Sequence, residues 1–264
     1  MKNYMILKAI ILGIIEGLTE FLPISSTGHL ILANEYLDFT GNFANLFSIV
    51  IQSGAILAVI IFFRKKIFPK NLKGESLSKF YRLWSRVIVG IIPAGILGIL
   101  FEDKIEALLF APKPVAVALI VGAIGIIFVE NKSISSTVED ELEMSYLDAL
   151  IVGVFQTLAL IPGMSRSAST IIGGRIKGFS RKVAAEFSFF LAIPTLLGAS
   201  LIKMMKTDIQ ITADEYILLA IGTFVSFIVA YLVIAAFMNY IKKRDFKIFA
   251  YYRIILGVVL LIIL

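Results

Sequence analysis

Long apolar segments dominate this chain, and only short polar stretches separate them. A helix needs roughly 20 mostly apolar residues to cross the hydrocarbon core of a bilayer. Segments of about this length cover residues 45–63, 84–101, 113–130, 182–205, 215–240 and 248–264. Because a backbone in lipid must satisfy its own hydrogen bonds, such segments fold as helices. The pattern predicts an all-α polytopic membrane protein with six transmembrane helices, in a single integral-membrane domain over residues 1–264.

Two further apolar regions are interrupted by polar turns. They cover residues 5–22 with 29–38 and residues 147–161 with 168–178, and a proline lies in each intervening turn. Non-helical backbone at membrane depth is tolerated only where it is buried in protein or faces water. We therefore predict two re-entrant helical hairpins in addition to the six transmembrane helices.

The two halves of the chain, about 1–130 and 147–264, resemble each other. The matched segments are 9–16 with 149–156 and, after one residue of slippage, 23–27 with 162–166. Each half would hold one hairpin and three spans, and an odd number of spans reverses the orientation of the second half. The pattern predicts an inverted-topology repeat, which places a binding site where the interrupted helices meet.

Basic residues gather in residues 64–86 and 242–247. Both segments are typical of cytoplasmic loops that contact anionic membrane lipid. This orientation puts both termini outside, so that the first hairpin enters from outside and the second from inside. The net charge of +6 could also suit a nucleic-acid-binding protein, but a chain that is 59% hydrophobic indicates a membrane protein and no nucleic-acid partner. The absence of cysteine excludes disulfides and thiol chemistry.

Two carboxylates, Glu16 and Glu20, lie four residues apart in the first apolar segment and therefore on one helical face. Ionisable groups at membrane depth are costly and by default mark a functional site. The pair could hold a divalent cation or serve as a metal-assisted acid or base. The structural alternative is that the glutamates pair with a buried basic group.

The turn after this pair contains Pro23, the hydroxyls of Ser25, Ser26 and Thr27, and His29, the single histidine of the chain. Hydroxyls after a proline typically cap the next helix, and a helix N-terminus attracts anions. Histidine can act as a base, an acid or a nucleophile near neutral pH. The alternative is that the hydroxyls only cap the helix and that His29 is a hydrogen-bonded core residue.

The second turn also has hydroxyl groups after a proline, in the sequence Ser165-Arg166-Ser167. Arg166 can bind a phosphate with two hydrogen bonds and stabilise transferred charge, or it can simply neutralise the glutamates. Weaker polar features are Gln52-Ser-Gly54 and Glu186-Phe-Ser188, which suit either interhelical hydrogen bonds or support of the site. Tyr252 and Arg253, at the mouth of the last span, are expected to be interfacial anchors.

The stretch from Glu16 to His29, Glu-Gly-Leu-Thr-Glu-Phe-Leu-Pro-Ile-Ser-Ser-Thr-Gly-His, closely resembles the first signature of the bacterial undecaprenyl-diphosphate phosphatases of the bacitracin-resistance type. Pro162-Gly-Met-Ser-Arg-Ser167 resembles the second signature, and the resemblance extends over essentially the whole chain. Ala168 departs from the pattern, since the family usually has glycine there, but the change removes no chemical group.

The resemblance implies six spans and two re-entrant hairpins in an inverted repeat. It implies hydrolysis of undecaprenyl diphosphate to the monophosphate and inorganic phosphate, with Mg²⁺ or Ca²⁺ as cofactor. This reaction recycles the lipid carrier of cell-wall synthesis and confers bacitracin resistance. It further implies a multi-pass protein of the bacterial cytoplasmic membrane whose active site faces outside. A homodimer is a candidate assembly.

In the expected mechanism, Glu16 and Glu20 hold the metal and Arg166 binds the terminal phosphate. Ser26 is the candidate nucleophile, with His29 as base and then acid; the alternatives are that His29 attacks directly or activates water. The residues expected to bind substrate are Ser25, Thr27, Gln52, Ser165 and Ser167. A rival from another class is a polyprenyl-phosphate flippase or ion-coupled transporter, since inverted repeats with broken helices are typical of transporters.

Overall fold

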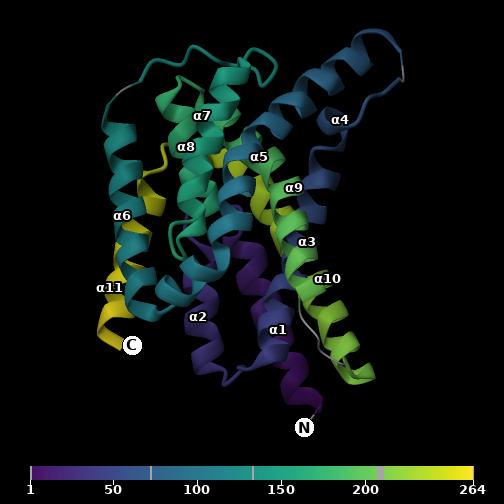
Figure 1. Ribbon diagram of the computed structural model, residues 1–264, viewed down its shortest axis with the longest axis vertical. Helices are drawn as coiled ribbons and strands as arrows, with labels where there is room; N and C mark the ends of the chain where they lie inside the picture. Colours follow the sequence, from purple (N-terminus) through teal and green to yellow (C-terminus); the bar gives the residue numbers. More distant parts are fainter. Residues whose placement is uncertain (1, 72, 133, 207–210, 264) are drawn as a thin grey trace.

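A computed structural model of the chain describes residues 2–71, 73–132, 134–206 and 211–263. These residues form a bundle of helices, and their only β-pairing is an isolated bridge between Val138 and Phe179 (Figure 1). The elements are α1 Lys2–Thr19, α2 Ser26–Tyr36, α3 Asn42–Phe62, α4 Arg64–Ile67, α5 Gly74–Leu109, α6 Pro112–Asn131, α7 Tyr146–Gln156, η1 Thr157–Leu160, α8 Arg166–Ile176, α9 Arg181–Lys206, α10 Ala213–Tyr240 and α11 Lys247–Ile263.

Five helices of the described chain, α3, α5, α6, α9 and α10, are long and apolar enough to cross a membrane. They confirm the all-α polytopic membrane class and coincide with five of the six expected spans. The remaining segment forms α11, which has 17 described residues. That α11 also crosses the membrane stays a prediction.

The basic segment 64–86 is mostly helical and not the loop that the charge pattern predicted. Its first residues form α4, and from Gly74 onward it belongs to α5, which continues to Leu109. Lysine and arginine are good helix formers, so clustered charge does not interrupt a helix. Arg82 and Arg86 lie one turn apart on α5, and they donate hydrogen bonds to the carbonyls of Leu142 and Met144. The charged end of α5 therefore holds the segment before α7 in place.

The two segments predicted to be re-entrant fold as helical hairpins, α1 with α2 and α7 and η1 with α8, and their re-entrant position in the membrane stays a prediction. Figure 1 shows the first hairpin in the lower part of the molecule, where both termini lie, and the second in the upper part. Glycines let each hairpin pack closely on a long helix. A Cβ at Gly13 would lie 2.6 Å from the carbonyl oxygen of Gly222 in α10, and a Cβ at Gly153 would overlap the carbonyl oxygen of Gly90 in α5.

These contacts follow one pattern in both halves, because α1 packs on α10 and α7 packs on α5. In a two-fold inverted repeat, α5 and α10 are the equivalent middle spans, so each hairpin packs on the middle span of the other half. The pattern supports the predicted duplication. Its boundaries, at about 1–130 and 147–264, stay a prediction.

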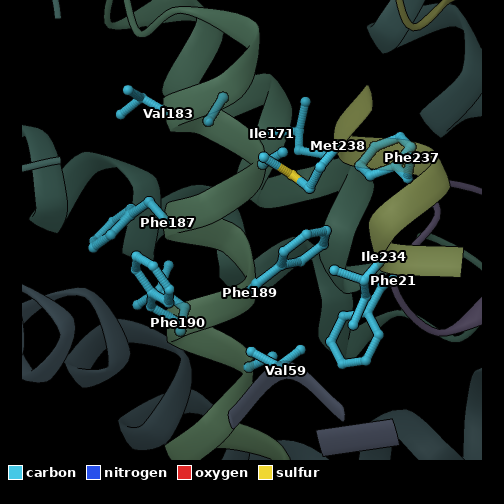
Figure 2. Packing of buried hydrophobic residues seen from close by; sticks show 14 of the residues in the cluster. Phe21, Val59, Ile171, Val183, Phe187, Phe189, Phe190, Ile234, Phe237 and Met238 are labelled. Carbon is cyan, nitrogen blue, oxygen red and sulfur yellow. The ribbon is translucent and has the colours of Figure 1, made fainter. Parts of the chain in front are cut away.

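A phenylalanine-rich core joins the halves and fixes the residue next to Glu20. Phe21 is fully buried, and its ring meets that of Phe189 in α9 edge-on, with centroids 5.2 Å apart. Figure 2 shows Phe187, Phe189 and Phe190 projecting from α9 into the cluster that also contains Phe21. Truncation of such a buried ring to alanine typically costs about 3–5 kcal/mol. The polar turn that follows α1 is thus attached to the largest hydrophobic cluster of the described residues.

Candidate active site

The second helix of each hairpin begins with the same unusual cap. Ser25 precedes α2 with φ 72° and its hydroxyl accepts from the Gly28 amide; Ser165 precedes α8 with φ 70° and accepts from the Ala168 amide. A positive φ is uncommon for serine, and strained backbone of this kind clusters at functional sites. Each turn therefore aims a helix N-terminus, with its unpaired amides, into the protein interior.

This geometry corrects the register of the internal repeat. The sequence comparison paired Ser26 with Ser165, whereas the caps pair Ser25 with Ser165. Ser26 and Arg166 are consequently equivalent, because each is the first residue of its helix. The sequence comparison aligned the prolines, but Pro23 lies two residues before its cap and Pro162 three, whereas the caps keep the same spacing from Glu16 and Gln156.

The hydroxyl of Ser26 donates a hydrogen bond to Glu20 Oε2 at 2.8 Å. The other carboxylate oxygen of Glu20 lies 3.4 Å from Nη2 of Arg166, and both charged side chains are more than 90% buried. The Glu20 carboxylate thus contacts the Ser26 hydroxyl of the first turn and the Arg166 guanidinium of the second. Glu20 can accept the proton of Ser26 while its charge is balanced by Arg166.

Arg166 is held by α9 as well as by Glu20. Its Nη1 donates to the carbonyl oxygen of Ser188 at 2.7 Å and lies 3.3 Å from the Ser188 hydroxyl, which in turn lies 2.8 Å from Thr170 Oγ1. The sequence marked Ser188 only weakly and missed Thr170. Glu186, marked with Ser188, instead pairs with Lys66 at 2.7 Å, because it lies on another side of α9.

A cavity of about 130 Å³ lies where the two turns meet. The polar residues that line it are Glu20, Ser25, Ser26, Thr27, Gln52, Ser165 and Arg166. Four of the five expected substrate-binding residues are in this lining. The fifth, Ser167, is fully buried and ties the turns together, since its hydroxyl donates to the carbonyl oxygen of Leu22 at 2.9 Å.

A larger hollow, of about 420 Å³, lies at the end of the molecule that carries α4. Several of its charged groups pair with each other on the same rim, as Lys66 bonds to Glu141 and Lys79 to Glu75. It contains none of the residues of the two signatures. Size alone therefore does not identify the active site, and the smaller cavity is the candidate because charge, hydroxyls and helix N-termini converge there.

His29 lies beside this cavity and is not among its lining residues. Its Nδ1 is 2.7 Å from the carbonyl oxygen of Ser25, and its Nε2 is 2.7 Å from the hydroxyl of Tyr252. Since a carbonyl only accepts, Nδ1 carries a proton, and in the neutral ring Nε2 accepts from the tyrosine. The acceptor for the Ser26 hydroxyl is Glu20 and not His29.

Glu16 is completely buried one helical turn before Glu20, and neither of its carboxylate oxygens has a hydrogen-bond partner. The Glu16 and Glu20 carboxyl groups are close enough to interact. Two carboxylates and one guanidinium leave one negative charge, which a cation could balance. No group of three His, Asp or Glu side chains gathers as a metal cluster within the described ranges. This donor set fits Mg²⁺, which proteins usually hold through one or two carboxylates and substrate phosphates.

Arg253 is not the interfacial anchor that the sequence predicted, because its side chain is buried, while the anchor role of Tyr252, which is 43% exposed, stays a prediction. Arg253 is 0% exposed and donates hydrogen bonds to carbonyls of both turns, and Tyr252 contacts His29. Their position near a span end suggested an anchor, but the end of that span lies against the two turns. No local signal in the sequence distinguishes these cases.

The fold and the site define a helical integral-membrane protein with a buried polar centre built from two opposed hairpin turns. A family model described as Bacitracin resistance protein BacA matches residues 9–259 of the chain. The chain belongs to this family.

Curated relatives align over nearly the whole chain. Undecaprenyl-diphosphatase 1 of Clostridioides difficile (strain 630) is 51% identical over 262 residues, which cover 97% of this chain and 95% of the relative. Undecaprenyl-diphosphatase of Enterococcus faecalis is 48% identical over 266 residues, with 98% and 96% covered. Undecaprenyl-diphosphatase of Acinetobacter baumannii (strain ATCC 17978) is 45% identical over 267 residues, with 99% and 97% covered.

Proposed function

We propose that this protein hydrolyses undecaprenyl diphosphate to undecaprenyl phosphate and inorganic phosphate. The observation that carries the proposal is the cavity at which Glu20 joins the Ser26 hydroxyl to the Arg166 guanidinium. A hydroxyl, its proton acceptor and a buried cation are what phosphoryl transfer requires. The full-length similarity to curated undecaprenyl-diphosphatases supplies the substrate.

Ser26 is the proposed nucleophile, and Glu20 takes its proton. As the serine oxygen bonds to the terminal phosphorus, the bond to the bridging oxygen breaks and undecaprenyl phosphate leaves. Water then hydrolyses the phosphoserine, which releases inorganic phosphate and restores Ser26. The hydrogen bond from Ser26 to Glu20 favours this assignment over a mechanism with His29 as base.

Arg166 binds the terminal phosphate and stabilises the charge that develops during transfer. The N-termini of α2 and α8 add unpaired backbone amides on two sides of the same cavity. Thr27, Gln52 and Ser165 line the cavity and orient phosphate oxygens. In this buried setting, such preorganised groups act more strongly than they would in water.

A divalent cation, Mg²⁺ or Ca²⁺, is proposed to bind between Glu16 and Glu20. When bound, it would neutralise phosphate charge and the unpaired charge of Glu16. The support is the buried carboxylate of Glu16, which has no other partner among the described residues.

We further propose that the protein lies in the bacterial cytoplasmic membrane with its active site facing outside, and that the polyprenyl tail and membrane lipid occupy its apolar surface. Basic residues at the end opposite the termini support this orientation. Recycling of the carrier would supply cell-wall synthesis and confer bacitracin resistance, because bacitracin sequesters the diphosphate. A homodimer stays a prediction. The relatives give no support to the flippase or transporter alternative.

The test is phosphate release from undecaprenyl diphosphate by protein purified in detergent, with and without Mg²⁺ or Ca²⁺. We expect metal-dependent release that falls on the order of 10²–10⁴-fold in E20Q, because the proton acceptor is lost. S26A should fall at least as far. The matched control is S85A, which removes a serine hydroxyl from α5 that does not line the cavity. Absence of release from folded wild-type protein would refute the proposal, and full turnover in S26A would exclude Ser26 as nucleophile.

A further inference from the structure

The first half of α11 places two adjacent residues, Tyr252 and Arg253, against the two hairpin turns. Arg253 is fully buried, whereas Tyr252 is 43% exposed. They lie in the last helix of the chain and far in sequence from either turn, yet Tyr252 touches His29 and Arg253 touches the backbone of each turn. Neither residue lines the cavity that contains Ser26 and Arg166.

Arg253 joins three parts of the protein through one guanidinium. Its Nη1 donates to the carbonyl oxygen of Pro23 in the first turn at 3.4 Å. Its Nη2 lies 3.2 Å and 3.0 Å from the carbonyl oxygens of Gly163 and Met164 in the second turn. Its Nε donates to the carbonyl oxygen of Leu119 in α6 at 3.0 Å. A planar guanidinium has five N–H donors in a rigid fork, which a lysine ammonium cannot reproduce.

The surroundings are shaped for this side chain. A Cβ at Gly122 of α6 would overlap Nη2 of Arg253, so any other residue there would displace the guanidinium from its carbonyl partners. No carboxylate pairs with Arg253 among the described residues, and its recorded partners are all backbone carbonyls. A buried charge is costly without compensation. The Arg253 guanidinium is compensated by its hydrogen bonds to backbone carbonyls of the two non-helical turns, and these carbonyls would otherwise be buried without donors.

Tyr252 holds the ring of His29 from the side opposite Ser25. The two rings are stacked, with an interplanar angle of 6° and centroids 5.5 Å apart. The tyrosine hydroxyl lies 2.7 Å from Nε2, while Nδ1 is bonded to the carbonyl oxygen of Ser25. This chain of contacts runs from α11 through His29 to the residue that caps α2.

We infer that Tyr252 and Arg253 are positioning residues of the proposed phosphatase site. Arg253 sets the distance between the two turns, so that Ser26 on one helix and Arg166 on the other act on a single phosphate. Tyr252 fixes the orientation and tautomer of His29, which then holds the Ser25 carbonyl. The role in turnover rests on the proposed function, while the contacts themselves can be tested without it.

The first experiment measures kcat and KM for R253K and Y252F. A displacement of about 1 Å at a reacting group can cost on the order of 10²-fold in rate. We therefore expect R253K to lose about that factor in kcat with little change in KM. Loss of one hydrogen bond in Y252F should lower kcat roughly 3- to 10-fold. The controls are Y251F, whose side chain is exposed on the same helix, and R64K, on an exposed arginine.

The second experiment needs no activity. His29 is the single histidine of the chain, so selective ¹⁵N-histidine labelling gives one pair of imidazole signals in the NMR spectrum. Wild-type protein should show the Nδ1–H tautomer with Nε2 as a hydrogen-bond acceptor, and Y252F should shift the Nε2 signal while Y251F does not. An unchanged spectrum in Y252F, or kcat within about twofold of wild type in both variants, would overturn the inference. If R253K does not fold, the kcat of Y252F and its His29 NMR signals decide whether the inference holds. Wild-type protein without phosphatase activity but with the expected His29 signals would refute the proposed function alone.

Discussion

The turns at Pro23 and Pro162 begin their second helices in the same way and then diverge. Each has a serine cap with φ near 70°, and each directs a helix N-terminus towards the shared cavity. The first helical residue is Ser26 in one turn and Arg166 in the other. Two similar turns thus present a hydroxyl from one side and a positive charge from the other, and Glu20 contacts both.

The helices before the turns differ in a parallel way. Glu16 in α1 corresponds to Gln156 in α7, and both are buried with polar atoms that lack partners. Only Glu16 is a carboxyl group that can carry a charge, so the acidic half of the site comes from the first hairpin and the basic half from the second. The comparison indicates that the two hairpins share a similar backbone and that the different residues at corresponding positions supply the chemistry.

Within this comparison of the two turns, the largest effect is expected from making them alike. R166S gives the second turn the residue type that the first has at its equivalent position, and it removes the cation that binds phosphate. Loss of such a stabilising group typically costs 10²–10³-fold in kcat, and we expect about that loss in phosphate release. R166K should recover only part of it, because lysine lacks the planar fork. R64S is the control, and near-normal turnover of R166S would show that the difference between the turns is not catalytic.

The next effect tests the pair Glu16 and Gln156. E16Q should raise the metal concentration needed for half-maximal phosphate release by at least about tenfold, because metal sites weaken by 10–100-fold even when supporting groups are lost. Q156E should leave the metal requirement unchanged. It should instead lower the free energy of unfolding by about 3 kcal/mol, because it buries an uncompensated carboxylate. Metal titrations and thermal unfolding in detergent measure the two outcomes, and an unaltered metal requirement in E16Q would remove Glu16 from the cation site.

A smaller effect concerns what the turns share. S25A and S165A should each lower the free energy of unfolding by about 1 kcal/mol, because a helix cap is lost. S25G and S165G should cost less, since glycine adopts a positive φ without strain. The order of the variants should be the same in both turns. A turn in which alanine and glycine behave alike would show that its serine is not held in a strained conformation.

The smallest effect on activity is expected at the far end of the molecule. Lys66 bonds to Glu186 and Glu141. Partial burial lowers the pKa of Lys66, but the two carboxylates raise it by more, so that this pKa lies above its ordinary value of 10.5. The stabilising contribution is therefore fully present below pH 10.5 and is lost as the pH rises through the higher folded-state pKa. K66M should keep phosphate release within about twofold of wild type. Its stability deficit in thermal unfolding should be constant from about pH 7 to 9 and shrink in more alkaline buffer.

Much of this arrangement could be predicted from the sequence. Hydropathy identified the helices and both hairpins, since burial in lipid imposes long apolar runs. Glu20, Ser26 and Arg166 were marked because polar groups in such runs are costly without a role. The length of the helix from Gly74 was missed, because hydropathy follows the membrane and not the helix itself.

What the tertiary structure alone decided is which of these groups meet. The sequence by itself determined the class of protein, the two turns and most of the groups that line the cavity, because these depend on local polarity and spacing. It did not determine that the Ser26 hydroxyl bonds to Glu20 and not to His29, or that Tyr252 and Arg253 support both turns. The contacts of Tyr252 and Arg253 join residues that are far apart in the sequence, whereas Ser26 and Glu20 lie six residues apart on either side of one turn. In both cases the direction of each side chain depends on how the helices pack together.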